Sequence, residues 1–260
     1  MTLLDSAPAA TGTATPAVRL HGVSKRFGTG PVVLDDVSLD VAEGEFLCLL
    51  GASGCGKSTL LNLVAGLDAP TSGTVEVTGG SAALMFQEAA LLPWLTAAQN
   101  VELALRLRGL GKRERRARSG ELLDLVRLRD AGGKRVHELS GGMRQRVAMA
   151  RALAQESRVL LMDEPFAALD AITRDVLHEE LVRIRASQQL TVLFVTHNVR
   201  EAVRLGDRVV LLSSRPGRVA KQYPVTFEQP RRIESPEVAG LSVTVTEDLR
   251  AEIRRHGGQS

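Results

Sequence analysis

Short continuous apolar runs recur along the chain and predict buried strands. Residues 46–50 read FLCLL and stop at Gly51, residues 159–162 read VLLM, and residues 190–196 are nearly all apolar or β-branched. Such runs are typical of strands buried on both faces of a parallel sheet. Between them, residues 58–65 and 169–187 carry apolar side chains at helical spacing. This alternation of strand and helix predicts an α/β domain with a parallel sheet covered by helices on both faces.

The rest of the chain shows three further patterns. Residues 18–27 predict a strand that runs into a loop, and residues 74–77 predict a short strand after a turn. From about residue 88 to 157 the sequence becomes rich in Leu, Arg, Ala and Glu with helical periodicity, which indicates a helical subdomain inserted into the sheet domain. The Ala, Thr and Pro content of residues 1–17 predicts a disordered lead-in. The main domain is expected over residues 18–230, with a short C-terminal tail over 231–260.

Composition excludes several classes of protein. The 260 residues carry a formal net charge of only +3, so we expect no nucleic-acid partner. No stretch approaches the ~18 consecutive apolar residues of a transmembrane helix, and the N-terminus lacks the pattern of a secretory signal. The two cysteines, Cys48 and Cys55, cannot form a disulfide framework, which favours a reducing cytoplasm. Between residues 106 and 118 seven basic residues meet only Glu114; a solvated helix face and a contact with anionic lipid headgroups are both open.

Residues 51–58 read GASGCGKS and match the phosphate-binding pattern G-x-x-x-x-G-K-[ST] between a predicted strand and helix. Glycines let backbone N–H groups surround phosphate oxygens, and the helix start adds partial positive charge. Lys57 supplies a charge for the β- and γ-phosphates, and the Ser58 hydroxyl is placed to bind Mg²⁺. Cys55 occupies a variable position, but its thiolate should be favoured beside Lys57. We therefore expect a thiol reagent to inactivate the protein and ATP to protect it.

Two carboxylates follow the predicted strand at 159–162, at the edge of the sheet where ligands bind in such folds. Asp163 would hold Mg²⁺ through water molecules. Glu164 would orient and deprotonate the attacking water. A strand that ends in Asp-Glu is common by itself. The phosphate-loop Lys57 upstream is what favours a role for this pair in nucleotide hydrolysis.

Residues 139–146 read LSGGMRQR and resemble the signature motif of ABC ATPases, which is commonly L-S-G-G-Q. The resemblance extends over about residues 18–230. Ser140, Gly141 and Gly142 predict a capped helix start that can bind an anion, although the phosphate loop already supplies one such site. In the family two subunits pair head to tail, and each ATP lies between one phosphate loop and the partner's signature. Met143 replaces the usual Gln, while the Ser and both Gly remain.

The resemblance also implies the fold and the site. It implies a P-loop NTPase with a RecA-like parallel-sheet core, an N-terminal antiparallel β region and the inserted helical subdomain. Its implied catalytic residues are Glu164, the switch histidine His197 and the Q-loop glutamine Gln87. Its implied Mg²⁺ ligands are Ser58, Gln87 and Asp163. The implied nucleotide-binding residues include an adenine-stacking aromatic and the D-loop aspartate, and they are Phe27, Gly51, Ser53, Gly54, Cys55, Gly56, Lys57, Ser58, Thr59, Ser140, Gly141, Gly142 and Asp170.

The segment QEAALLPWLT at 87–96 is similar to that of importers of nitrate, sulfonates and taurine, as are residues 164–174 and 211–218. Within this group, residues 230–232 and the short tail favour aliphatic sulfonates, with taurine and nitrate as alternatives. The resemblance implies an ATP-hydrolysing homodimer in MgATP on the cytoplasmic face of the membrane. Its implied partners are two membrane permease subunits and an extracytoplasmic solute-binding protein. An ABC ATPase of DNA maintenance is the rival, but the chain lacks that group's long coiled coil or zinc module.

An apolar cluster in this segment leads to an interaction hypothesis. Leu91, Leu92, Pro93 and Trp94 form an apolar cluster beside Gln87. If exposed, such a cluster calls for a partner. We expect it either to line a groove for a cytoplasmic helix of the permease or to pack inside the helical subdomain.

Overall fold

A computed structural model describes residues 16–257. The predicted lead-in over residues 1–17 therefore lies outside the described residues except for its last two positions. Of these, Ala17 is buried, and its N–H donates to the Val41 carbonyl at 2.8 Å.

The larger sheet forms the centre of the molecule, with the strand order β5-β6-β7-β3-β8-β9 within the described residues. Neighbouring strands pair in parallel from β5 to β8, and β9 is antiparallel to β8. Its strands are β3 (Phe46–Leu50), β5 (Ala82–Met85), β6 (Val159–Asp163), β7 (Thr191–Val195), β8 (Arg208–Leu212) and β9 (Val219–Pro224). Every residue of β3 and β7 is buried, as their apolar runs predict.

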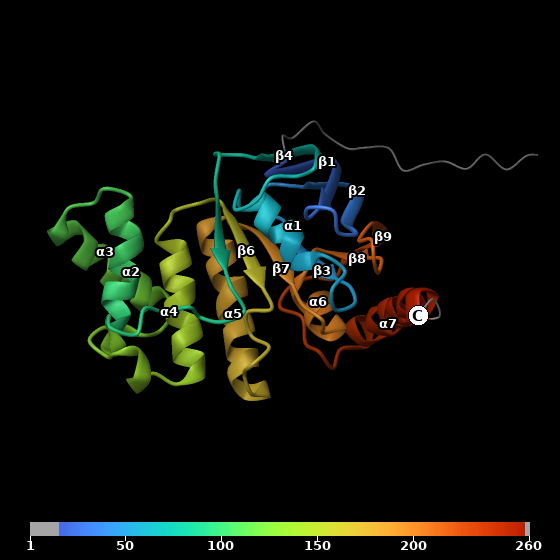
Figure 1. Ribbon diagram of the computed structural model, residues 1–260. Helices are drawn as coiled ribbons and strands as arrows, with labels where there is room; N and C mark the ends of the chain where they lie inside the picture. The colour runs from blue at the N-terminus through green and yellow to red at the C-terminus, as the bar shows by residue number, and fades with distance from the viewer. Residues whose placement is uncertain (1–15, 258–260) are drawn as a thin grey trace, which may run out of the picture.

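Two apolar cores lie on opposite faces of this sheet, and the alternation along β3 separates them. Phe46, Cys48 and Leu50 belong to one core, with the buried residues of the helical subdomain and of α5 (Ala171–Gln188), α6 (Val199–Leu205) and α7 (Pro236–Gly257). Leu47 and Leu49 belong to the other, beneath α1 (Lys57–Val64) and the smaller sheet. Figure 1 shows these layers, with α1 and the smaller sheet on one side of the central strands and α6 and α7 on the other.

The smaller sheet is antiparallel, with the order β2-β1-β4. Its strands are β1 (Val18–Arg26), β2 (Val32–Val41) and β4 (Ser72–Val77). Exposed and buried residues alternate along much of β1 and β2, as expected for a sheet with one face in the core and one in water. This sheet confirms the predicted N-terminal antiparallel region.

The helical subdomain contains α2 (Ala97–Leu107), α3 (Lys112–Leu125) and α4 (Gly141–Leu153), with short 3₁₀ turns at Arg129–Ala131 and Val136–Glu138. In Figure 1, α2 and α3 lie away from the strands, and α4 lies between them and α5. Thr96 begins α2 with a capping box, because its hydroxyl accepts from Gln99 N–H and the Gln99 side chain accepts from Thr96 N–H.

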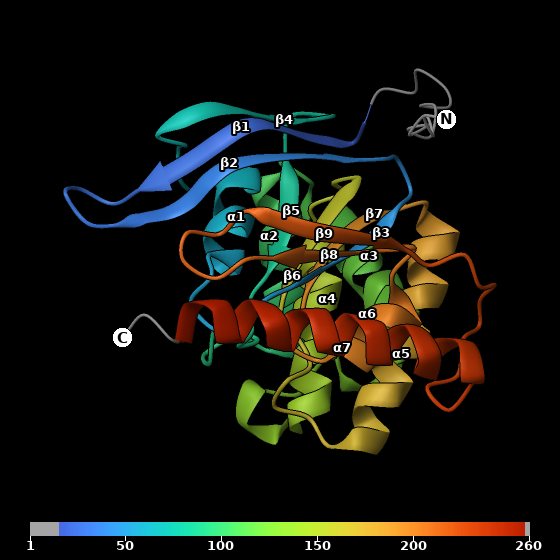
Figure 2. The same ribbon diagram turned by 90° about the vertical axis from the view of Figure 1, so that its right-hand side faces the viewer.

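The segment after residue 230, which the sequence suggests is a tail, contains the 22-residue helix α7. Val238 and Val245 on α7 are fully buried, and the helix packs against α6 (Figure 2). Arg231 anchors the start of this segment, because its buried guanidinium donates to the carbonyls of Gly206 and Val225. Folded structure therefore continues beyond the boundary drawn at residue 230. Over the described range 16–257, none of the helices has the length and apolar character that crossing a membrane requires.

Candidate active site

The phosphate loop connects β3 to α1 and has little room for side chains. A Cβ at Gly51 would lie 2.6 Å from Cys55 Sγ and 3.1 Å from the Leu212 carbonyl oxygen. Gly56 precedes α1 with a φ of 99°, and no side chain caps the helix start. The first N–H groups of α1 are thus left for a ligand, as in an anion-binding helix start. Lys57 is buried at this point, and its Nζ donates to the carbonyls of Gly51 and Ala52 at 2.9 and 3.0 Å.

A hollow of about 450 Å³ opens over this loop. Its volume lies within the usual range for small-molecule sites, about 300–1,000 Å³. The residues that line it come from β2, the phosphate loop, α1 and the ends of β5 and β6: Val33, Ser53, Gly54, Gly56, Lys57, Ser58, Thr59, Gln87 and Glu164. The structure therefore brings most of the predicted phosphate-loop residues together with two of the predicted catalytic residues.

The parallel register of the sheet explains this convergence. Leu49 on β3 pairs with Val195 on β7, and Asp163 on β6 pairs with the same Val195. The chain therefore leaves three neighbouring strands at one edge, where ligands bind in open parallel sheets. The phosphate loop follows β3, Glu164 follows β6 and His197 follows β7 by two residues.

Glu164 and His197 form a pair at this edge. The distance between His197 Nδ1 and Glu164 Oε2 is 2.8 Å. The Glu164 backbone N–H donates to the Val195 carbonyl at 3.0 Å, and its φ is +43°, which is uncommon for a residue with a side chain. Backbone strain of this kind clusters at functional sites. Glu164 is partly buried at 22% side-chain exposure, whereas His197 is 66% exposed and can meet a ligand.

Gln87 is held in place by α4, the helix that begins within the signature. The Gln87 carbonyl accepts from Gln145 Nε2 at 2.9 Å. Arg151, also on α4, donates to the carbonyls of Ala89 and Ala90, which follow Gln87 closely, at 2.9 and 2.6 Å. Gln145 and Arg151 are not among the functional residues that the sequence predicts. Six residues turn an α-helix by well over one turn and leave these side chains on different faces of α4, so only the tertiary structure shows that both reach the segment after β5.

The signature residues begin α4. The Ser140 hydroxyl accepts from Met143 N–H at 3.3 Å and caps the helix, as predicted. Gly142 has a packing role, because a Cβ there would lie 2.5 Å from Thr173 Cγ2 on α5. Neither glycine of the motif, nor Ser140, lines the hollow over the phosphate loop of the same chain.

Four other predicted nucleotide-binding residues also lie outside the lining of the hollow: Gly51 and Cys55 in the phosphate loop, and Phe27 and Asp170 in other segments. Of these, Phe27 and Asp170 are the ones that a second molecule could meet. Phe27 follows β1, is 53% exposed, and has Lys25 Nζ 4.8 Å from its ring centroid. Asp170 caps α5 by accepting from Thr173 N–H at 2.9 Å, and this bond holds the pKa of the Asp170 carboxyl below its usual value. Both side chains are exposed, so a second molecule can reach them.

The expectation of a favoured thiolate at Cys55 is wrong. Cys55 is only 1% exposed, and this burial raises the pKa of its thiol, although the charge of Lys57 opposes the shift. The Cys55 side chain belongs to the apolar core beneath α1, and the β8–β9 loop closes over its backbone, since a Cβ at Gly217 would lie 2.1 Å from the Cys55 carbonyl oxygen. Loss of solvent outweighs the neighbouring cation, so the neutral thiol is the favoured form.

Comparison with known proteins agrees with this geometry. The model of the ABC transporter family matches residues 34–167. The chain is 49% identical over 209 residues to the taurine import ATP-binding protein TauB of Sinorhizobium fredii, covering 78% of each chain. It is 48% identical over 230 residues to the aliphatic sulfonates import ATP-binding protein SsuB 1 of Burkholderia lata, covering 86% of this chain and 69% of that protein. The chain therefore belongs to the ABC transporter family.

A solved structure gives the same result for the fold. A dimeric ATP-binding cassette in a post-hydrolysis state, bound to ADP and phosphate, superposes with a TM-score of 0.72 at 33% identity. The match covers 81% of this chain and 100% of that chain. The predicted P-loop NTPase fold of the ABC type is confirmed, and so, at the level of the family, is the prediction of an ATP-hydrolysing enzyme coupled to transport.

Proposed function

We propose that this chain is the ATP-hydrolysing subunit of an importer for small organic sulfonates, with aliphatic sulfonates as the first candidate and taurine as the second. The observation that carries the proposal is the hollow over the phosphate loop, where Lys57 and Glu164 meet in a chain similar to sulfonate and taurine import proteins. Nitrate, the third member of the group, remains an alternative cargo.

The residues of the hollow suit a nucleoside triphosphate. The uncapped start of α1 and Lys57 attract the phosphates, and Phe27 offers an exposed ring for the base. Glu164 takes a proton from the attacking water. The water oxygen bonds to the γ-phosphorus, and the bond between that phosphorus and the ADP oxygen breaks. His197 orients the Glu164 carboxylate through Nδ1. In this role its Nε2 would meet the γ-phosphate.

The donor set of the site fits Mg²⁺. Ser58 and Gln87 line the hollow, and the half-buried Asp163 ends β6 beside it, so the available ligands are all oxygen atoms. Among residues 16–257 there is no cluster of three or more His, Cys, Asp or Glu side chains that could hold a metal ion. A site of this kind suits Mg²⁺, which keeps several waters and binds through substrate phosphates and one or two protein groups. Bound there by Ser58, Gln87 and Asp163, the ion would neutralise charge on the β- and γ-phosphates.

The position of the signature supports a head-to-tail homodimer in MgATP. Ser140 and Gly141 begin a helix that can bind an anion but lies outside the hollow of its own chain. A second copy would place this helix start against the γ-phosphate bound by the first. The related ATP-binding cassette, whose structure is dimeric, provides a precedent.

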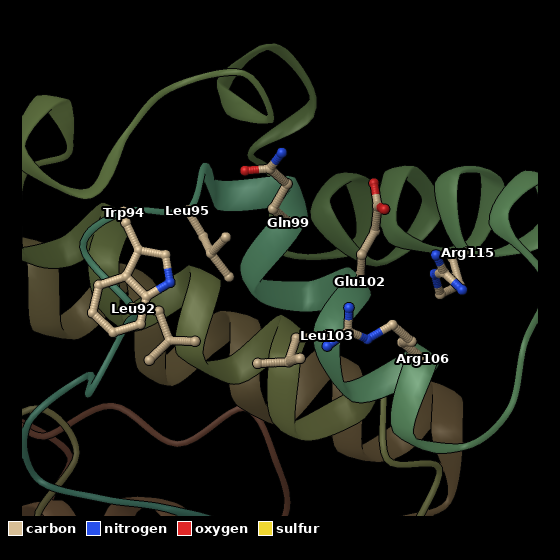
Figure 3. Close-up of a pocket in the computed structure, with 8 residues that line it drawn as sticks. All are labelled: Leu92, Trp94, Leu95, Gln99, Glu102, Leu103, Arg106 and Arg115. Atoms are coloured by element: carbon tan, nitrogen blue, oxygen red, sulfur yellow. The ribbon is translucent and has the colours of Figure 1, made fainter.

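A groove in the helical subdomain supports a permease contact. It has a volume of about 320 Å³ and lies over α2 (Figure 3). Leu92, Leu95 and Leu103 contribute apolar surface, and Trp94 is 66% exposed at its edge. Leu91, by contrast, packs against the core, so only part of the predicted cluster is available to a partner. We assign the groove to a cytoplasmic helix of each of two permease subunits, which places the ATPase on the cytoplasmic face of the membrane.

The cargo is tested by growth. A strain that lacks this protein should fail to grow on ethanesulfonate or taurine as the only sulfur source and should grow normally on sulfate. The wild-type gene should restore growth, and a copy carrying Lys57→Ala should not, because the transporter then lacks ATP hydrolysis. An extracytoplasmic solute-binding protein encoded for the same transporter should bind the same sulfonate. Normal growth on both sulfonates, with a defect confined to nitrate, would transfer the proposal to nitrate.

A further inference from the structure

A buried polar chain lies directly behind the Glu164–His197 pair. It joins His178 on α5, Glu201 on α6 and Thr196, the residue before His197. The distance between His178 Nε2 and Glu201 Oε1 is 2.6 Å, and the Thr196 hydroxyl bonds to Glu201 Oε2. The three residues are only 1%, 6% and 3% exposed. Burying a carboxylate is costly unless it is fully paired, so this chain is a demanding feature to build into a core.

The direction of each hydrogen bond in the chain can be assigned. The Asn198 backbone N–H, which can only donate, bonds to Thr196 Oγ1 at 3.0 Å. The Thr196 hydroxyl therefore accepts from Asn198 and donates its own proton to Glu201. The side chain of Asn198 in turn accepts from the N–H groups of Arg200 and Glu201 and caps α6. The residues on both sides of His197 are thus fixed to one buried carboxylate and one helix start.

The imidazole of His178 supplies the remaining bond to Glu201. Its other nitrogen, Nδ1, is buried without a hydrogen-bond partner among the described residues and lies 3.9 Å from Asp175 Oδ1. A carboxylate oxygen accepts, so Nε2 of His178 carries a proton and donates it to Glu201 Oε1.

The same imidazole also backs the other half of the catalytic pair. The Phe166 ring lies 5.6 Å from the His178 ring, centroid to centroid, with an interplanar angle of 59°. Phe166 is 1% exposed and follows Glu164 by two residues. His178 thus contacts the segment after Glu164 by packing and the segment before His197 through Glu201.

We propose that Thr196, Glu201 and His178 are positioning residues that hold His197 and Glu164 in register for hydrolysis. The inference rests on the catalytic roles proposed for Glu164 and His197. It also gives a physical link from α5, which Asp170 caps, to the switch histidine. Movement of α5 against α6 would be felt at His197, because the buried carboxylate joins the two helices.

Thr196→Val gives the sharpest test, since it removes the hydroxyl and keeps the shape. It leaves Glu201 Oε2 and the Asn198 N–H unpaired, so we expect kcat for MgATP hydrolysis by the purified full chain to fall about 10- to 100-fold, as for small misplacements of catalytic groups. The KM for ATP should change less than threefold, because none of the three residues lines the phosphate-loop hollow. Thr196→Ser restores the hydroxyl and should recover most of the rate.

His178 provides a second matched pair. His178→Leu removes the donor to Glu201, whereas His178→Gln can place an amide N–H near the position of Nε2. We expect the leucine variant to be slow and the glutamine variant to regain activity. The kcat of the Thr196→Val/His178→Leu double variant should lie within about twofold of that of the slower single variant, because both changes break the same hydrogen-bonded chain. Glu201→Gln, which cannot accept from both donors in the same way, replaces either variant that fails to fold.

Two controls separate the possible outcomes. Tyr223→Phe removes a part-buried hydrogen bond, 2.7 Å from Tyr223 Oη on β9 to Asp248 Oδ2 on α7, and neither residue lines the hollow, so it should lower the melting temperature without changing kcat. A folded Thr196→Val protein with kcat within twofold of wild type, or a Thr196→Ser protein as slow as Thr196→Val, would overturn the positioning role. Glu164→Gln is measured in the same assay. If it keeps near-normal hydrolysis, the proposed catalytic roles fail and this inference falls with them; if it is inactive while Thr196→Val is normal, only the inference fails.

Discussion

The starts of α1 and α4 are both suited to bind phosphate, yet their surroundings differ. The start of α1 has no side-chain cap, carries the buried Lys57 and opens into a hollow shared with Gln87 and Glu164. The start of α4 is capped by the exposed Ser140 and is absent from that hollow. One helix start thus has the chemistry of hydrolysis around it within the chain, and the other does not.

This difference is what a shared site requires. An anion-binding helix start without its own catalytic neighbours is useful when it meets a phosphate held elsewhere. Later residues of α4 have a different task, because Gln145 and Arg151 hold the loop that follows β5. The helix therefore lies between the proposed partner's nucleotide and the segment that leads to the groove over α2.

The largest effect is expected from a charge at the start of α4. Gly141→Asp has room, since a Cβ there would lie 3.5 Å from its nearest neighbour, Leu169 Cδ2. A carboxylate at a helix start stabilises the helix by about 0.3–1 kcal/mol, but it would repel a γ-phosphate. We expect a protein at least as stable as wild type that binds ATP and hydrolyses it more than about 100-fold more slowly. Phosphate release and thermal unfolding measure the two effects.

Mixing two inactive variants sharpens this test. Lys57→Ala removes the cation of the phosphate loop, and Gly141→Asp spoils the signature. In a head-to-tail pair of one copy of each, one of the two shared sites keeps both an intact phosphate loop and an intact signature. Activity of the mixture well above that of either variant alone would support sharing between chains. Gly141→Asn, which has the same shape without the charge, serves as the control, and normal hydrolysis by Gly141→Asp alone would contradict the comparison.

Much of the fold follows from local patterns. The run at β3 ends at a glycine, and the helical spacing of α1 begins directly after the phosphate loop, so both elements could be predicted from neighbouring residues. Helix α7 could not be predicted in this way. Val238 and Val245 are buried only because α6 lies against them, and the 22-residue segment looked like a tail when its partner surface was unknown.

The residues of the site also fall into those that local sequence predicts and those that it does not. Lys57, Glu164 and His197 each stand directly after a strand or within a motif, so sequence spacing predicts them. The bond between His178 and Glu201 joins residues 23 positions apart on two helices, and no local pattern indicates it. The burial of Cys55 beneath the loop at Gly217 likewise depends on a segment far along the chain. Residue type predicts a side chain's chemistry when local backbone structure positions that side chain. The prediction fails where a segment distant in sequence decides whether solvent reaches it.

An intermediate effect is expected at the far end of α4. Arg151→Lys keeps the charge but loses the planar fork that reaches the carbonyls of Ala89 and Ala90. We expect faster hydrogen exchange over residues 87–95 and a hydrolysis rate lowered by about threefold to tenfold, corresponding to about 1 kcal/mol. Arg146→Lys on the same helix is the matched control, because Arg146 donates to the Val126 carbonyl instead. Equal effects of the two changes would show that α4 does not act through this loop.

The smallest effect concerns the thiol beside the start of α1. Burial raises the pKa of the Cys55 thiol, so at pH 7 the neutral form dominates and alkylation should be slow in the folded chain. The rate should rise only at pH values above the ordinary pKa of a thiol, because burial delays formation of the thiolate in the folded chain. Because the folded pKa lies above the unfolded value, this group favours the folded state below the unfolded pKa, and its contribution is lost as pH rises toward the folded pKa.

A Cys48→Ser variant leaves Cys55 as the only thiol, and the same variant in denaturant gives the reference rate. Equal rates in the two states at pH 7 would show that solvent reaches Cys55 in the folded chain, so that the thiol is not closed off beneath the hollow at the start of α1.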